Sequence, residues 1–184
     1  EYDEKYKSWN FDHLPIIPEH FELRPVVSKN MVNGKWVTQK DTGAEKLLDS
    51  LKKLLKTCEI VINAGDAGRE GQVIIDELLH YLNNKKPVYR LWLDGLNDAE
   101  MKKSFAKLYN NDEKLGLFKA GKLRAQTDWI VGINLSRAVS IKFKEKGISS
   151  TFSVGRVQTP VLKLLYDRYT EINDFKSKNF YDID

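Results

Sequence analysis

The sequence contains a single cysteine, Cys58, among its 184 residues. This scarcity excludes a fold built on disulfides and a cysteine-rich zinc site. Its three histidines, at positions 13, 20 and 80, form no His-Glu-x-x-His pair. No apolar run approaches the roughly 20 residues that a membrane-crossing helix needs, and residues 1–5 lack the apolar stretch of a signal peptide. These absences predict a soluble protein of the reducing cytoplasm, without a membrane partner.

The charge balance shows only a mild basic excess. Thirty Lys and Arg residues against 26 Asp and Glu residues give a formal net charge of +4. Such an excess permits a polyanionic partner but does not require one. The positions of the charged residues therefore say more about a polyanionic partner than the net charge does.

The first half of the chain alternates between helical and strand patterns. Residues 1–37 predict an irregular path with a short strand at 21–27 and a hairpin turn at Asn33-Gly34. A capping-box pattern at 42–45 then begins a helix that should end near Thr57. A strand at 59–63, a helix at 69–82 and a strand at 88–93 complete a βαβ unit, which predicts part of a parallel, three-layer α/β sheet.

The second half predicts helices alone. A second capping box at 97–100 begins a helix to about Tyr109, and longer helical patterns follow at 117–146 and 157–171. The strands are expected to stop after Gly95. We therefore predict an α/β domain at 1–95, a helical domain at 96–176, and the start of a further strand at 177–184.

The loop between the first buried strand and its helix carries two acidic residues. Asp66 follows the strand, and Glu70 lies in the first turn of the helix. Open α/β sheets bind ligands at the carboxyl ends of their strands, and two converging carboxylates suit Mg²⁺. The alternative is that both residues only cap the helix and complement its dipole.

Polar residues also interrupt the long helical pattern of the second half. Arg124 and Asp128 are four residues apart and share a helix face, which is typical of a surface ion pair. Asn134 and Arg137 lie in an apolar stripe, so they need either a ligand or partners within the protein. The segment 153–160 offers glycine, a helix start and phosphate-binding side chains, but its composition also fits a simple capped loop.

Three ordered segments together resemble the type IA DNA topoisomerases, in the form of the bacterial topoisomerase III group. Residues 63–72 resemble the acidic Asp-x-Asp-Arg-Glu-Gly-Gln motif of that family's TOPRIM domain. Residues 122–137 resemble its Ala-Arg-x-x-x-Asp-Trp-x-x-Gly-x-Asn-x-Thr-Arg signature, with Leu123 in place of the alanine. Residues 153–160 resemble the Ser-x-Gly-Arg-x-Gln-Thr-Pro signature of the helical domain that borders the single-strand DNA groove. Segments 8–10 and 14–18 also resemble the family, so the similarity covers essentially the whole chain.

The resemblance implies a fold, a metal and a partner. The fold is a partial TOPRIM domain followed by an all-helical segment, the cofactor is Mg²⁺ held by Asp66 and Glu70, and the partner is DNA, mainly single-stranded, on the bacterial chromosome. The residues implied in DNA binding are Arg69, Arg124, Asp128, Asn134, Arg137, Ser153, Arg156 and Gln158. Gly68 stands where the family has its middle aspartate, so we expect a weaker Mg²⁺ site.

The family's catalytic groups are not found among these residues. Its nucleophilic tyrosine lies in a Ser-Tyr-x-Arg-Thr context, which none of the eight tyrosines of this chain has. Its catalytic glutamate lies on a first strand that would precede Glu1. We therefore expect an internal segment of a topoisomerase that is inactive alone. Two alternatives stay open: another TOPRIM enzyme, such as a primase or nuclease, or a non-catalytic nucleic-acid-binding module.

Overall fold

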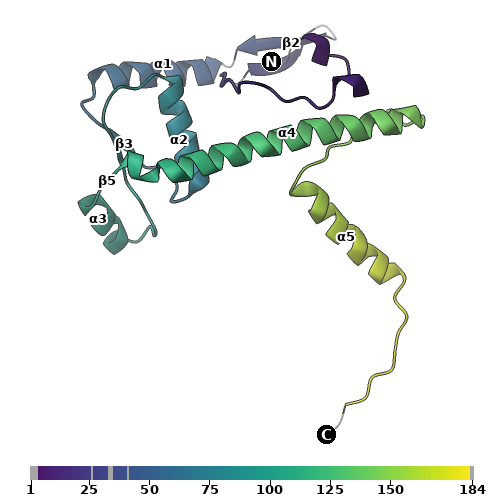
Figure 1. The fold of residues 1–184 in the computed structure, drawn as a ribbon. Helices are drawn as coiled ribbons and strands as arrows, with labels where there is room; N and C mark the ends of the chain where they lie inside the picture. Colours follow the sequence, from purple (N-terminus) through teal and green to yellow (C-terminus); the bar gives the residue numbers. More distant parts are fainter. Residues whose placement is uncertain (1–3, 26, 33–34, 41, 183–184) are drawn as a thin grey trace. The chain divides into compact units, whose positions relative to one another are not determined.

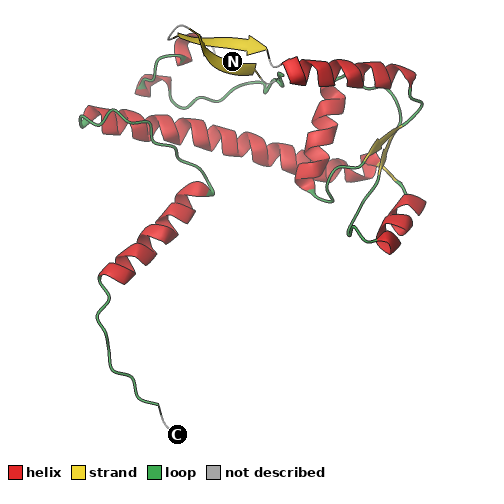
Figure 2. Cartoon of the chain, turned by 180° about the vertical axis from the view of Figure 1, so that it is seen from behind, coloured by secondary structure: helices red, strands yellow, loops and turns green. Residues whose placement is uncertain are grey.

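The computed structural model describes residues 4–25, 27–32, 35–40 and 42–182. By its internal contacts the chain divides into two compact units, one of residues 20–125 and one of residues 1–19 together with 126–184. The long helix α4 (Leu115–Glu145) begins in the first of these and continues in the second (Figure 1). Helices form most of the regular structure in both (Figure 2).

The unit of residues 20–125 begins with a hairpin. Strands β1 (Val27–Val32) and β2 (Lys35–Lys40) pair antiparallel, so the hairpin predicted around positions 33–34 is confirmed, although those two residues lie outside the described ones. Helix α1 (Thr42–Thr57) follows and ends where the sequence predicted. The short strand predicted at 21–27 is wrong for residues 21–25, which have no regular structure.

This unit also contains a small three-stranded sheet. Strands β3 (Val61–Asn63) and β4 (Val88–Arg90) pair in parallel and are connected through helix α2 (Arg69–Tyr81), which confirms the predicted βαβ unit. A third strand, β5 (Tyr109–Asn110), pairs antiparallel with β4, so the order is β3-β4-β5. The expectation that strands stop after Gly95 is therefore wrong. The fold class remains α/β, with a small mixed sheet.

Short elements join the sheet to the long helix. Helix α3 (Asp98–Ala106) begins after Asn97, whose side chain accepts a hydrogen bond from the Glu100 amide, as its capping pattern predicted. The 3-10 helix η3 (Asn111–Lys114) then leads into α4. Gly121 of α4 lies against α2: a Cβ there would overlap the Val73 side chain and lie 3.2 Å from the Arg69 carbonyl oxygen. This residue lets α2 and α4 approach closely.

The other unit is built along the second part of α4. It contains the short 3-10 helices η1 (Glu4–Tyr6) and η2 (Phe11–His13), and helix α5 (Gln158–Asn173). Gly147, with φ +83°, ends the α4 segment as expected. The described residues at 174–182 form no strand. The two compact units divide the chain elsewhere than at the predicted domain boundary of 95/96, since β5 pairs with β4 and the first part of α4 packs against α2. The boundary itself stays a prediction.

Candidate metal loop and nucleic-acid-binding residues

The acidic loop follows β3 and packs tightly against the first turn of α2. A Cβ at Gly65 would lie 2.7 Å from the Gly71 carbonyl oxygen. A Cβ at Gly71 would overlap the main-chain N, C and O of Asp66. Only glycine allows this approach at both positions, so the two glycines fix how Asp66 lies relative to α2.

Arg90 lies beneath the same loop and binds its main chain. Its side chain has no exposed surface. Nη1 donates to the carbonyl oxygens of Asn63 at 3.1 Å, Gly65 at 2.6 Å and Leu91 at 2.8 Å. Nη2 donates to the carbonyl oxygen of Asp66 at 2.6 Å. One guanidinium therefore connects the end of β4 to the whole turn that leads from β3.

A buried network of amides orients this guanidinium. Nε of Arg90 donates to Gln72 Oε1 at 2.9 Å, and Gln72 Nε2 donates to Asp76 Oδ2 and Asn111 Oδ1, both at 2.9 Å. Asn63 donates to the same Asn111 oxygen at 3.1 Å. Burial lowers the pKa of Arg90 below its ordinary value, and the negative charges of Asp76 and Asp66 oppose that shift.

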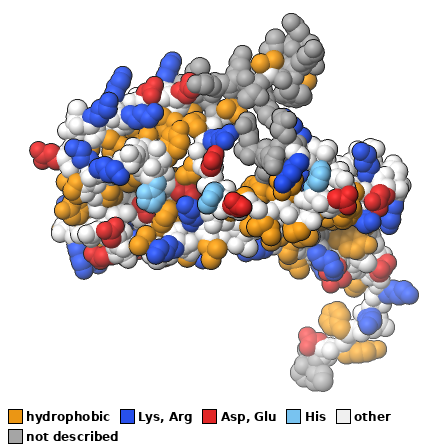
Figure 3. All heavy atoms as spheres, turned by 45° about the horizontal axis from the view of Figure 1, so that its top comes forward, with side chains coloured by type: hydrophobic (Ala, Val, Ile, Leu, Met, Phe, Trp, Pro, Cys, Tyr) orange, Lys and Arg blue, Asp and Glu red, His pale blue; other side chains and the backbone are white. Residues whose placement is uncertain are grey.

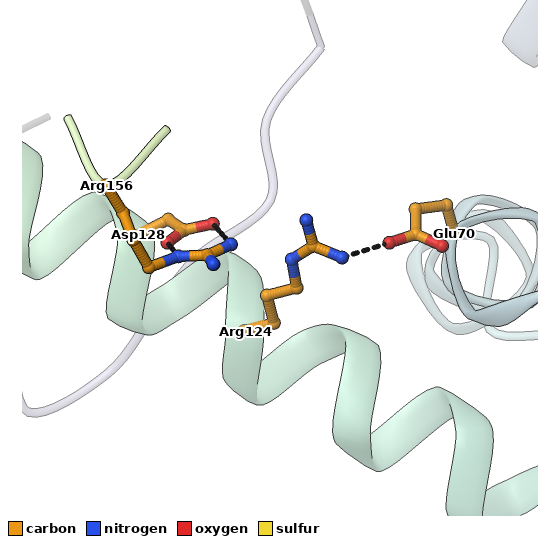
Figure 4. A network of polar contacts seen from close by, with 4 residues as sticks. All are labelled: Glu70, Arg124, Asp128 and Arg156. Carbon is orange, nitrogen blue, oxygen red and sulfur yellow. Dashed lines mark hydrogen bonds and ion pairs between the residues drawn. The ribbon is translucent and has the colours of Figure 1, made fainter. Parts of the chain in front are cut away.

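The two predicted metal ligands are exposed at this loop. Asp66 is exposed at the end of the turn. Glu70, with 66% of its side chain accessible, accepts a hydrogen bond from Arg124 Nη1 at 2.8 Å, so a cation already lies at this carboxylate (Figure 4). Arg69, the first residue of α2, is exposed beside it.

These groups fit a loosely held, hydrated cation. Mg²⁺ takes oxygen ligands and commonly keeps several waters, with one or two protein carboxylates. Among the described residues no group of three Asp, Glu, His or Cys side chains is arranged to hold a metal. Asp66 and Glu70 therefore remain the two candidate carboxylate ligands of this loop.

A second arginine–carboxylate pair, which the sequence did not predict, lies in the other unit. Arg156 donates to both oxygens of Asp128, from Nε to Oδ1 and from Nη2 to Oδ2, in the two-pronged geometry that guanidinium groups use for carboxylates and phosphates (Figure 4). The hydrogen bond and the attraction of Asp128 raise the pKa of Arg156.

The loop before α5 is held against α4 by two serines. Ser136 Oγ accepts from the Val154 amide at 2.9 Å, and Ser140 Oγ accepts from the Phe152 amide at 2.8 Å. Ser136 and Ser140 are one helical turn apart, so the loop runs along the helix. This arrangement presents Ser153 outward, where it accepts from Gln158 Nε2 at 2.7 Å.

Asn134 and Arg137 make contacts within the protein. Asn134 Oδ1 accepts from the Ile16 amide at 2.6 Å, and its Nδ2 donates to the Ile16 carbonyl oxygen at 2.9 Å. Arg137, only 5% exposed, donates to the Tyr6 carbonyl oxygen at 2.8 Å and lies over the Trp9 ring. These contacts favour the packing interpretation that the sequence left open for both residues.

Sequence reasoning missed the buried support of the loop. Arg90 carried a signal, because it is a charge within the apolar run of residues 88–93, and such a charge needs a strong set of partners. Gln72 belongs to the acidic motif but gave no sign of its buried position. The partners of both residues lie on other elements, so spacing along the chain does not reveal them.

Comparisons with known proteins give consistent matches. The DNA topoisomerase family model matches residues 112–184. DNA topoisomerase 3 of Pasteurella multocida is 37% identical over 99% of this chain and 26% of that protein. DNA topoisomerase 3 of Staphylococcus haemolyticus is 38% identical over 98% of this chain and 23% of its own length. The structure of full-length topoisomerase I from Thermotoga maritima aligns with a TM-score of 0.54 and 27% identity, over 82% of this chain and 26% of that one. The chain thus spans about a quarter of the length of these relatives.

Proposed function

We propose that this chain, as a relative of the bacterial DNA topoisomerases, supplies the metal-binding loop and part of the DNA-backbone contacts of a type IA topoisomerase. The observation that carries the proposal is the similarity to DNA topoisomerase 3 over 99% of the chain. The activity of the whole protein would be a change of DNA topology by transient cleavage of one strand, strand passage and religation. Its setting would be the bacterial cytoplasm, at the chromosome. In the described part of the chain, no helix is long and apolar enough to span a membrane.

The metal part of the proposal assigns Mg²⁺ to Asp66 and Glu70. When bound there, the ion would neutralise negative charge on phosphate oxygens close to the site of cleavage. The chain's own contribution is to hold the two carboxylates at the end of β3 and the start of α2. Arg124, which donates to Glu70, would compete with Mg²⁺ for that carboxylate.

The DNA part of the proposal assigns backbone contacts to the exposed residues. Arg124 and Arg156 already bind carboxylates, and a guanidinium binds phosphate with the same geometry. A phosphate could therefore take the place of either carboxylate without a change of donor. The further residues proposed for such contacts are Arg69, Ser153 and Gln158. Asp128 would then be the carboxylate that a phosphate displaces from Arg156, while Asn134 and Arg137 would act through packing.

Single-stranded DNA is the favoured partner because residues 153–160 resemble the segment that borders the single-strand groove of type IA topoisomerases. Contacts to the backbone leave base edges unread, so binding should depend little on sequence. Basic and acidic side chains are interspersed over the visible face of the molecule (Figure 3). The two other classes that the sequence left open, a different TOPRIM enzyme and a non-catalytic module, are not favoured by the matches to topoisomerases along the chain.

A binding measurement tests the proposal directly. Fluorescence anisotropy with labelled single-stranded oligonucleotides of several sequences should give similar dissociation constants, each weaker in higher salt. Supercoiled plasmid with Mg²⁺ should remain unrelaxed, because this chain has no Ser-Tyr-x-Arg-Thr segment to supply the nucleophile. Absence of single-strand binding at low salt, or relaxation by the pure chain, would overturn the proposal.

A further inference from the structure

We propose that Arg90 is the positioning residue of the acidic loop: it holds the main chain of residues 63–66 so that the Asp66 and Glu70 carboxylates are presented together. Its relevance to metal binding rests on the proposed function. The clamp itself can be tested without metal.

The first argument is the set of acceptors. Arg90 donates to three carbonyl oxygens of the turn after β3, those of Asn63, Gly65 and Asp66, and to that of Leu91 beside it. A planar guanidinium with five donors can reach several carbonyls at once, whereas a lysine ammonium donates from a single point. The several carbonyl oxygens of the turn therefore favour arginine over lysine at this position.

The second argument is that Arg90 is itself held in place. Gln72 accepts from Nε and is fixed in turn by Asp76 and Asn111. The guanidinium also lies over the Trp92 ring, 4.9 Å from its centroid. In the described structure every hydrogen bond of this guanidinium goes to a main-chain carbonyl or to Gln72. Among the described residues, no carboxylate accepts a hydrogen bond from it.

The third argument is what the clamp leaves free. The Asp66 carbonyl oxygen is bound by Arg90, and Gly71 lies against the Asp66 main chain from the side of α2. The main chain of Asp66 is thus fixed on two sides, while its side chain is exposed. Pre-organisation of this kind spares a metal ion the cost of ordering the loop.

Hydrogen exchange in the full chain, followed by NMR without metal, tests the clamp. The Gly65 amide is the reporter, since it donates to Asn63 Oδ1 within the turn, and the Leu82 amide at the far end of α2 is the reference. Arg90→Lys should speed exchange at Gly65 by roughly tenfold or more relative to Leu82, because the bonds from a charged group to the loop are lost. Phe118→Leu is the matched control: Phe118 is buried and contacts His80. Because this contact is near Leu82, the variant should not speed exchange at Gly65 relative to Leu82.

Equal changes at Gly65 and Leu82 in Arg90→Lys would overturn the proposal. Should Arg90→Lys fail to fold, Gln72→Met removes the acceptor of Arg90 Nε together with the hydrogen bonds from Gln72 Nε2 to Asp76 and Asn111, and it should loosen Gly65 in the same direction. Equal changes at both amides in that variant would count against the clamp in the same way.

Titration of the same proteins with MgCl₂ separates the clamp from the metal assignment. Arg90→Lys should weaken Mg²⁺ binding by about tenfold or more, as loss of a residue that orients metal ligands commonly does, and Phe118→Leu should not. If the unaltered chain shows no Mg²⁺-dependent shifts at Asp66 and Glu70 while Gly65 still responds to Arg90→Lys, the metal assignment fails and the clamp stands. If Mg²⁺ binds and Arg90→Lys leaves its affinity unchanged, the positioning role is overturned.

Discussion

Arg156 donates from two nitrogens to the two carboxylate oxygens of Asp128, with the Nη2–Oδ2 distance at 3.1 Å. Both side chains remain partly exposed, at 48% and 38%. An arginine in this state is already oriented and needs only a change of acceptor to bind a phosphate. Replacing Arg156 and replacing Asp128 should therefore change DNA affinity in opposite directions.

Removal of the cation should weaken DNA binding. Arg156→Ala is expected to reduce affinity for all single-stranded oligonucleotides several-fold and to flatten the slope of log affinity against log salt by about 0.7, the value for one phosphate contact on a single strand. Anisotropy titrations at several salt concentrations measure both effects. The matched control is Arg168→Ala, an exposed arginine of α5 that pairs with Glu171. A second control, Lys52→Ala, removes an exposed cation of α1. Equal losses from all three variants would indicate diffuse attraction instead of a specific contact.

Neutralisation of the competing carboxylate should have the opposite effect. Asp128→Asn removes both the ion pair and a negative charge from the neighbourhood of the phosphate, so single-strand binding should become tighter. Asp167→Asn, which breaks the exposed pair with Lys163 on α5, removes the same charge elsewhere in that unit. If Asp128→Asn weakens binding instead, the carboxylate is needed to orient Arg156, and simple exchange of acceptors is wrong.

A restored carboxylate should strengthen the metal site. The backbone at Gly68 is extended, with φ 175°, and a Cβ there would meet no atom within 4 Å. Gly68→Asp can therefore add an oxygen ligand without strain, and Mg²⁺ affinity rises with ligand number and charge. Titration calorimetry should show tighter binding than in the unaltered chain. Gly116→Asp, at a position that is equally open, adds the same charge away from the loop and should change little. Equal gains in both variants would show that added negative charge alone raises the Mg²⁺ affinity. Asp66 and Glu70 would then be helix-capping groups.

The sequence predicted the elements that carry a strong local signal. The strand, loop and helix at 59–82 were found because an apolar β-branched run, a glycine loop and a helical period follow one another. The strand β5 was missed because it has only two residues, Tyr109 and Asn110, and exists through its pairing with β4. The alternation at 21–27 was misleading for a related reason: alternation alone does not make a strand without a partner.

The candidate site divides in the same way. Asp66, Glu70 and the arginines were visible from motifs, because the residues of a motif lie close together in the chain. The contact between Glu70 and Arg124 joins residues 54 positions apart, and the Arg90 clamp depends on where the loop folds. Such relationships are set by packing, here by the approach of α4 to α2 at Gly121. A local sequence pattern therefore does not predict these long-range contacts.

The glycine at the start of α2 should be irreplaceable. Gly71→Ala would place a methyl group against the main chain of Asp66, which has no flexible side chain to yield. Overpacking of this kind costs about 1–3 kcal/mol of unfolding free energy. Gly116→Ala is the control, since its Cβ would meet open space, and replacing a helical glycine by alanine there should be neutral or stabilising by up to about 1 kcal/mol. Chemical denaturation measures both. Equal stability of the two variants would show that the loop moves readily and that its position is not fixed by Gly71.

The role of Asn134 can be decided by separating stability from DNA binding. Its amide accepts from the Ile16 N–H and donates to the carbonyl oxygens of Ile16 and Ile130, and Ile16 is only 2% exposed. Asn134→Ala leaves these buried main-chain groups without their partner, which should lower the free energy of unfolding by about 1–3 kcal/mol. Asn173→Ala, at the exposed end of α5, should stay within about 0.5 kcal/mol of the unaltered chain. Single-strand affinity of the folded Asn134→Ala protein should be unchanged, because the amide is used within the protein. A variant that kept its stability but lost DNA affinity would instead make Asn134 a direct contact and reverse the packing interpretation.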